Sequence, residues 1–206
     1  RTFRVSVLGG FVTRLAVGGM PFLLPLLYQV GMGLPAWQSG LLMMPAAAAA
    51  MGMKVIATAL LRRYGFRRVL TVNTVLVGCT VAAYSQVGAG TPIPVIVGIG
   101  LLLGLFNSLQ YSSMNSMAYA DIDAADVSMA STMASTMQQM SMSFGLALGS
   151  LVTGFYLSGL PQTDRLAVTG ALHHAFLTLA VMTVLSSLSF RSLRDDDGES
   201  VSRGAG

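Results

Sequence analysis

The chain has 206 residues, of which 53% are apolar and only 10% are charged, and its mean hydropathy is +0.68. A soluble globular domain carries roughly 25% charged residues, so this composition excludes an ordinary soluble domain. The single cysteine, Cys79, excludes a disulfide framework and a cysteine-based zinc site. The neighbours His173 and His174 point about 100° apart on a helix, so no shared metal site is predicted.

Four long stretches of the chain contain no Asp, Glu, Lys or Arg: residues 15–53, 69–120, 127–163 and 166–190. They run 39, 52, 37 and 25 residues, and a membrane-spanning helix needs about 20. A soluble helix of such length would show a charged face at helical period, and these stretches contain no charged residue. The sequence therefore predicts a multi-pass protein whose first partner is the lipid bilayer.

Glycine, proline and charged residues divide the apolar stretches into six predicted membrane-spanning helices. In chain order they cover residues 2–30, 37–61, 69–87, 94–117, 128–157 and 172–190. Residues 1–190 thus form one all-α transmembrane bundle. Residues 158–170 are interpreted as a turn-rich connection. The tail, residues 191–206, is rich in Asp, Gly and Ser and is predicted to be disordered on the cytoplasmic side.

Basic residues collect on one side of the six predicted spans. Nine of them fall on the side that carries both termini: Arg1, Arg4, Arg62, Arg63, Arg67, Arg68, Arg191, Arg194 and Arg203. The opposite side has only Arg165. Positive charge stays in the cytoplasm, so both termini are predicted to be cytoplasmic in the inner membrane. The net charge of +4 is thereby explained without a nucleic-acid partner.

Only two basic residues and no acidic residue fall well inside the predicted spans, since Arg4 lies at the start of the first span. Arg14 lies about 18 Å into the first span, near mid-membrane, at 1.5 Å per residue. A charge there is costly. Arg14 either caps carbonyls where Pro21 and Pro25 disturb the helix or faces a water-filled cavity. Lys54 lies nearer the cytoplasmic end of its span, where it either snorkels to the interface or belongs to a gate.

The fourth span carries a stripe of polar side chains on one helical face. It consists of Asn107, Gln110, Tyr111, Met114 and Asn115. Amides do not face lipid, so the stripe either forms hydrogen bonds to neighbouring helices or lines a solvated cavity. In the fifth span, methionines recur near helical spacing beside Gln138: Met129, Met133, Met137 and Met140. These methionines either fill the core or form a surface that faces a ligand. Ser141, Gly145 and Gly149 then form a small-residue ridge that favours close helix packing.

The loop after the second span resembles a known transporter signature. Its residues Arg63-Tyr64-Gly65-Phe66-Arg67-Arg68 are similar to the loop motif of major facilitator superfamily transporters, with Arg62 at the place of the motif's Asp. Around Arg14, Lys54, residues 107–115 and residues 138–145, the chain resembles the last six helices of fourteen-helix drug/proton antiporters of the EmrB/QacA type.

The resemblance implies two inverted three-helix repeats that pair with a second six-helix bundle around a midplane cavity. The first and fourth spans would line this cavity, the second and fifth would gate it, and the third and sixth would face lipid. Its expected wall is formed by Arg14, Asn107, Gln110, Tyr111, Asn115 and Gln138. Its expected cytoplasmic gate is formed by Lys54, Arg63, Gly65, Arg67 and Arg68.

The expected function is half of a secondary transporter that exports amphipathic or cationic drugs, with the proton gradient as energy source and no cofactor or metal. The expected partners are a small-molecule substrate and the N-terminal half of the same transporter or a second copy. Transport of a single polar metabolite and a half-size subunit acting as a homodimer remain alternatives. A packing subunit is disfavoured by the polar stripe, and an enzyme by the lack of a catalytic cluster in the spans. The proton-coupling acid is expected in the missing half.

Overall fold

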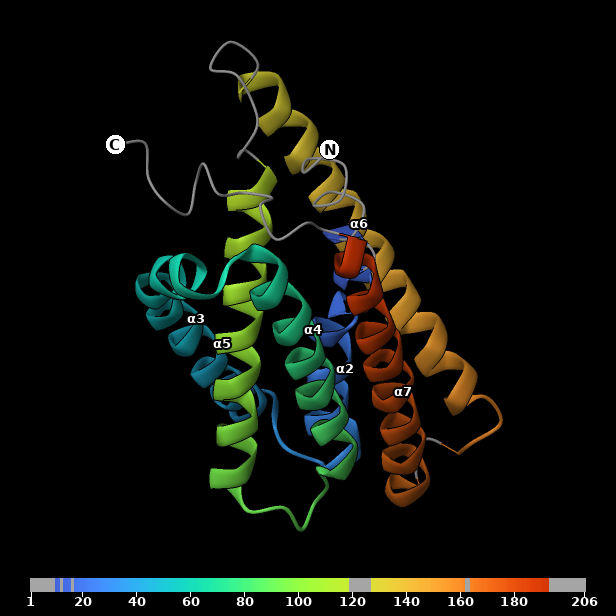
Figure 1. The fold of residues 1–206 in the computed structure, drawn as a ribbon. Helices are drawn as coiled ribbons and strands as arrows, with labels where there is room; N and C mark the ends of the chain where they lie inside the picture. The colour runs from blue at the N-terminus through green and yellow to red at the C-terminus, as the bar shows by residue number, and fades with distance from the viewer. Residues whose placement is uncertain (1–9, 12, 16, 119–126, 162–163, 193–206) are drawn as a thin grey trace.

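A computed structural model of the chain describes residues 10–11, 13–15, 17–118, 127–161 and 164–192, and this part of the chain is helical without strands (Figure 1). The helices are α2 (Met20–Leu26), α3 (Ala36–Tyr64), α4 (Phe66–Ala83), α5 (Ile93–Ala118), α6 (Val127–Leu157) and α7 (Arg165–Ser186). Short helices extend three of them: the π-helix Leu27–Gly31 and the 3₁₀-helices Tyr84–Gln86 and Ser187–Ser192. The all-α prediction is confirmed.

Five of these helices, α3 to α7, are long and apolar enough to cross a membrane. The first predicted span is described in part: helical residues precede α2, and a turn at Gly18–Gly19 interrupts them. The predicted 191–206 tail lies almost entirely outside the described residues, and so does the acidic loop around residues 121–126. The six-helix architecture of the spans is therefore as expected.

Three predicted helix boundaries are wrong. Helix α3 ends at Tyr64 rather than at residue 61, so Arg62 and Arg63 lie in its last turn rather than in a loop. Helix α7 begins at Arg165 rather than at residue 172, because Asp164 caps it: one carboxylate oxygen accepts from the backbone N–H groups of Leu166 and Ala167 at 3.1 and 3.2 Å. The second half of the connection interpreted as turn-rich is thus helical. Helix α4 begins at Phe66 rather than at residue 69, since Gly65 alone makes the turn from α3 with a φ of +75°.

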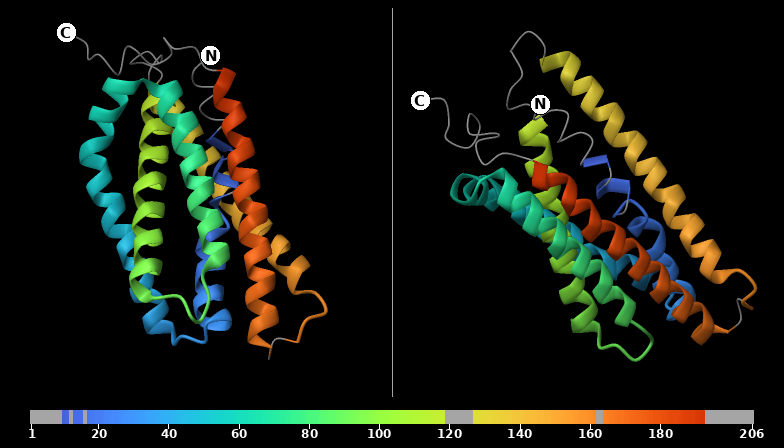
Figure 2. Two further views of the ribbon diagram at one scale, coloured as in Figure 1. Left: turned by 60° about the horizontal axis from the view of Figure 1, so that its bottom comes forward. Right: turned by 45° about the vertical axis from the view of Figure 1, so that its right-hand side comes forward.

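The helices form a bundle with a well-buried centre and two exposed edges. Helices α4 and α7 pack together, and Tyr84 at the end of α4 stacks on Phe176 of α7 with ring centres 5.6 Å apart. Helices α3 and α6 lie at opposite edges (Figures 1 and 2). In the most apolar stretch of each helix, the buried share is 17% for α3 and 22% for α6, against 56% for α4 and 44% for α7. The edge helices therefore expose apolar surface on more than one face.

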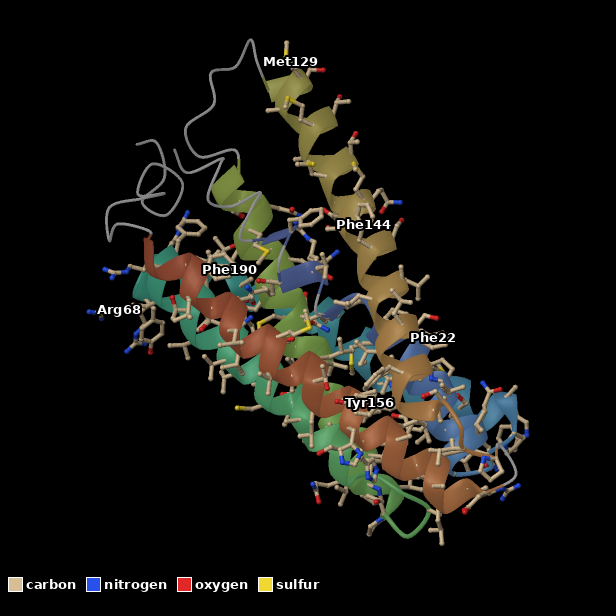
Figure 3. The ribbon with its side chains drawn as sticks, turned by 90° about the vertical axis from the view of Figure 1, so that its right-hand side faces the viewer. Phe22, Arg68, Met129, Phe144, Tyr156 and Phe190 are labelled. Atoms are coloured by element: carbon tan, nitrogen blue, oxygen red, sulfur yellow. The ribbon has the colours of Figure 1, made fainter. Side chains whose placement is uncertain are left out.

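Helix α6 joins the bundle through glycines. A Cβ added to Gly145 would lie 2.8 Å from the Cα of Gly18, and one added to Gly149 would lie 2.6 Å from the Cα of Gly19. Only glycine permits such backbone contact, so the predicted small-residue ridge does pack a helix crossing. Toward Met129, α6 stands apart from the other described helices (Figure 3).

Candidate functional site

Arg14 is the buried charge of the bundle. Its side chain is 7% exposed, and its guanidinium carbon lies 5.2 Å from the centre of the Tyr111 ring on α5, a cation–π distance. A Cβ added to Gly10 would come within 2.9 Å of an Arg14 Nη atom and 3.2 Å of the Met114 sulfur. Arg14 is thus enclosed by its own helix and by the Tyr111–Met114 turn of α5.

The Arg14 guanidinium is incompletely satisfied. Its Nε atom is buried and has no hydrogen-bond partner among the described residues. The Tyr111 ring attracts the charge but accepts no conventional hydrogen bond from that N–H group. A buried donor without a partner is costly, and more so on a cation. The arrangement can therefore bind an acceptor or an anion, and we define Arg14 and Tyr111 as the Arg14 centre.

The Arg14 centre lies off the middle of the helices. Tyr111 is seven residues before the end of α5 at Ala118, which corresponds to about 10 Å along the axis. That end of the bundle also carries the turn from α3 to α4, with Arg62, Arg63, Arg67 and Arg68, and we call it the arginine-rich end. Thr13, the residue before Arg14, forms a hydrogen bond of 3.1 Å with Ser186 at the same end of α7.

Gln110 takes part in a different contact. Its Nε2 donates to the Thr74 hydroxyl and its Oε1 accepts from Asn73 Nδ2, each at 2.7 Å. Asn73 Nδ2 also donates to the Phe106 carbonyl at 2.8 Å, and the Thr74 hydroxyl donates to the Leu70 carbonyl at 2.7 Å. We call Asn73, Thr74 and Gln110 the α4–α5 clamp. Gln110 is 3% exposed and joins two helices, so here helix-to-helix hydrogen bonding accounts for the polar side chain.

The remaining residues of the expected cavity wall are more dispersed. Asn107 is half-buried one turn before Tyr111, and Asn115 is exposed one turn after it. Gln138 is half-buried on the part of α6 before the glycine crossing. Toward Met129 that part stands away from the other described helices, whereas Ser141, three residues after Gln138, is fully buried and Phe144 lies 6.3 Å from the ring of Phe11. The structure brings Arg14 and Tyr111 together, and among the described residues no hydrogen bond or ring contact joins the Gln138 side chain to them.

The expected gate residues divide into a loop and a distant lysine. Gly65 makes the turn, Arg63 lies 5.6 Å from the ring centre of Tyr64, Arg67 is half-buried and Arg68 is exposed. Lys54 is exposed on α3, ten residues before Tyr64, or about 15 Å along the helix. It therefore does not share the loop cluster.

Sequence reasoning missed two polar contacts between helices. Asn73 is 3% exposed inside the clamp, and its Oδ1 has no partner among the described residues. Its spacing of four from the buried Val69 and Val77 is the signal that places it on the inner face of α4. Ser108 donates to the Ala50 carbonyl at 2.7 Å and joins α5 to α3. Within the described ranges, no group of three His, Cys, Asp or Glu side chains could hold a metal ion.

The sequence has relatives among known proteins. It matches the family model of the Major Facilitator Superfamily over residues 2–146. It is 32% identical to the "Putative multidrug resistance protein MdtD" of Enterobacter sp. (strain 638), over 97% of this chain and 42% of that protein. Proteins of the same name from Pectobacterium atrosepticum and Salmonella paratyphi B are 29% and 30% identical over 95% of this chain. The chain spans 42% of the length of each of these curated relatives.

Proposed function

This chain belongs to the major facilitator superfamily, and we propose that it forms one six-helix half of a secondary transporter that exports amphipathic or cationic drugs in exchange for protons. The relatives named as multidrug resistance proteins support the substrate class. The observation that carries the transport function, as distinct from the substrate class, is the Arg14 centre. A buried, incompletely bonded charge inside a membrane bundle is costly where nothing uses it.

The surface of the two edge helices supports pairing with a second bundle. On α3 an exposed apolar stripe follows helical spacing through Trp37, Leu41, Met44, Met51 and Val55. On α6 a similar stripe includes Met129, Met133, Met140, Phe144, Leu151 and Phe155. One lipid-facing side per helix does not account for helices with so little of their apolar stretches buried. We propose that the N-terminal half of the transporter, or a second copy of this bundle, covers these stripes.

We propose that the arginine-rich end faces the cytoplasm of the inner membrane. The described helices alternate in direction, so the turn from α3 to α4 and the end of α7 share one side (Figure 2). The sequence places nine arginines on that side against Arg165 on the other. Accessibility labelling of cysteines introduced at Tyr64 and Leu160 from either side of intact cells tests this. Labelling of Tyr64→Cys from outside the cell would contradict it.

The proton-coupling acid is expected outside this chain. Helices α3 to α7 contain no Asp or Glu, and Asp164 caps α7 at the end opposite the arginine-rich end. Arginine stays protonated and serves only as a fixed charge. We therefore propose that the other half carries the acid. Reconstituted alone, these 206 residues should show no substrate movement driven by a pH gradient, and robust transport would place the coupling site within them.

Substitution of Arg14 in the full-length transporter tests the proposed function. Arg14→Gln keeps polarity and removes the charge, and Arg14→Lys keeps the charge. Dye efflux from energised cells should fall in Arg14→Gln and be partly retained in Arg14→Lys. Membrane quantities of each variant must be equal for the comparison. Unchanged efflux in Arg14→Gln would remove the Arg14 centre from the function.

A second candidate function is transport of a single polar, anionic metabolite. The unpartnered Nε–H of Arg14 favours it, because arginine binds carboxylates and phosphates with charge-assisted hydrogen bonds. Metabolite uptake and dye efflux measured on the same Arg14→Gln variant separate the two. Loss of uptake for one class of anion, with dye efflux unchanged, would favour the metabolite carrier.

A further inference from the structure

Two cavities adjoin at the arginine-rich end, between α3 and α4. The larger, of about 330 Å³, is at the lower end of the range for ligand pockets. Its walls are almost entirely apolar: Leu60 from α3, Val69, Val72 and Leu76 from α4, and Leu109 from α5. Val72 and Leu76 are exposed, so this cavity opens to the side of the bundle. In a membrane, that side opening would meet acyl chains.

The smaller cavity, of about 230 Å³, is polar. It is lined by Tyr64, Gly65, Arg67 and Arg68. Tyr64 and Arg68 line both cavities, so the polar cavity and the apolar cavity meet at these two residues. Figure 3 shows Arg68 at the outer edge of the bundle. A ligand that fills both cavities has an apolar tail and an anionic head.

The spacing along α4 fits the depth of a lipid. Val72 and Leu76 follow Arg68 at four and eight residues, so they extend the same helical face by about 12 Å from the arginine. Tyr64 and Arg68 hold the interfacial position where aromatic and basic side chains meet headgroups. At the base, Asn73 is bound to α5 through the clamp, which fixes this wall.

The apolar and the polar cavity together form one groove. We propose that this groove binds an anionic phospholipid of the adjacent leaflet, with one acyl chain in the apolar cavity and the phosphate at Arg68. The walls match an acyl chain, and the arginine cluster matches a phosphate. Basic pockets between membrane helices are a known kind of site for anionic headgroups. A soluble anion would occupy the polar cavity alone, and a neutral lipid would occupy the apolar cavity alone. The site lies apart from the Arg14 centre and does not depend on the transported substrate.

Photocrosslinking of the full-length transporter tests this. The probe is phosphatidylglycerol with a diazirine in its acyl chain, at low fraction in phosphatidylethanolamine vesicles, and adducts are mapped by peptide mass spectrometry. We expect adducts at Leu60, Val72 and Leu76. Unlabelled phosphatidylglycerol should compete, whereas water-soluble glycerol phosphate should not. Phosphatidylcholine with the same diazirine should label the groove roughly fivefold less, since it lacks net charge.

Paired variants separate the head from the tail. Arg68→Gln should reduce labelling roughly fivefold, and Val72→Trp should abolish it by filling the cavity. Two matched controls should label as the wild type: Arg63→Gln, on the same turn but outside both cavities, and Leu185→Trp, exposed on α7 beside a different groove.

Several results would overturn the proposal. Equal loss in Arg63→Gln would mean general attraction to the surface, and competition by glycerol phosphate would mean a soluble-anion site. Equal labelling by phosphatidylcholine would remove the headgroup selectivity. An absence of adducts in the wild type would mean that another part of the transporter covers the groove. Because the competition experiments use the wild type, they hold even where a variant fails to fold.

Discussion

Helix α5 presents two polar groups that are neighbours in sequence and differ in their surroundings. Gln110 points to α4 and bonds to Asn73 and Thr74 at 2.7 Å. Tyr111 lies under the Arg14 guanidinium at 5.2 Å, where the Nε donor is left without a partner among the described residues. The clamp uses amide donors of both Gln110 and Asn73 within the protein and leaves only the neutral acceptor Asn73 Oδ1 without a partner among the described residues, whereas the Arg14 centre leaves a donor on a cation unused.

This difference separates packing from binding within one polar stripe. Hydrogen bonds between membrane helices contribute on average about 0.6 kcal/mol each, so the clamp is a modest structural contact. A buried charge with an unused donor costs free energy, and a ligand that accepts from it would recover part of that cost. We therefore expect substitutions in the clamp to change stability and substitutions in the Arg14 centre to change transport.

The largest effect is expected for Arg14→Gln. Removal of a charge-assisted hydrogen bond to substrate should lower efflux by about tenfold to a hundredfold. Thermal stability should be unchanged or higher, because an incompletely bonded charge leaves the membrane interior. Efflux assays and thermal unfolding of the purified full-length protein measure the two effects. A large loss of stability would instead make Arg14 a structural residue.

Tyr111 should show a smaller effect that depends on the ring. Tyr111→Leu removes the cation–π contact, worth about 1 kcal/mol, and should lower efflux roughly fivefold. Tyr111→Phe keeps the ring and should stay near the wild type. Efflux rates at equal expression check this pair. If Tyr111→Phe is as impaired as Tyr111→Leu, the hydroxyl rather than the ring face contributes.

Gln110→Leu should lower the free energy of unfolding by about 1 kcal/mol, because two hydrogen bonds to α4 are lost while Thr74 keeps its bond to Leu70. Substrate rank order should not change. The double variant Gln110→Leu/Asn73→Leu should cost less than the sum of the single variants, since the pair shares one bond. Altered substrate preference in Gln110→Leu would place the clamp in the cavity wall after all.

The smallest effect is expected for the loop. Neutralising Arg67 and Arg68 should slow turnover while the rank order of substrates is preserved, since the loop lies at the end of the bundle that rocks rather than at the Arg14 centre. Turnover at saturating dye and a substrate panel measure this. Part of the loss can come from altered membrane orientation, so a topology assay on the same variant is the control.

The sequence predicted the helices better than their ends. Charge-free stretches longer than a bilayer span leave little freedom about which segments are helices. The α7 start was missed because serine, glycine and proline at residues 158–161 favour a turn, whereas Asp164 just after them is a normal helix cap. The α4 start was missed because Gly65 needs no further loop residues once its φ is positive.

The candidate site was predicted in part, for a physical reason. Positions such as Gln110 and Tyr111 lie about 100° apart on a helix, so one broad stripe can face two different neighbours. Which neighbour covers each side chain depends on how α4 and the first span pack, and spacing does not specify this. Gln138 shows the same limit, because its distance from Arg14 depends on the angle at which α6 crosses the first span.

The glycine crossing makes α6 a lever. Gly145 and Gly149 touch Gly18 and Gly19 backbone to backbone, so the side chains that hold the angle between the two helices lie beside the crossing, as in the Phe11–Phe144 ring pair. Beyond Phe144 the helix extends for another 17 residues to Val127, about 25 Å. Over that length, a change of about 10° at the crossing displaces the far end by about 4 Å, roughly the width of one methyl group. A small adjustment between four glycines is thus converted into a side-chain-sized movement of the exposed methionines.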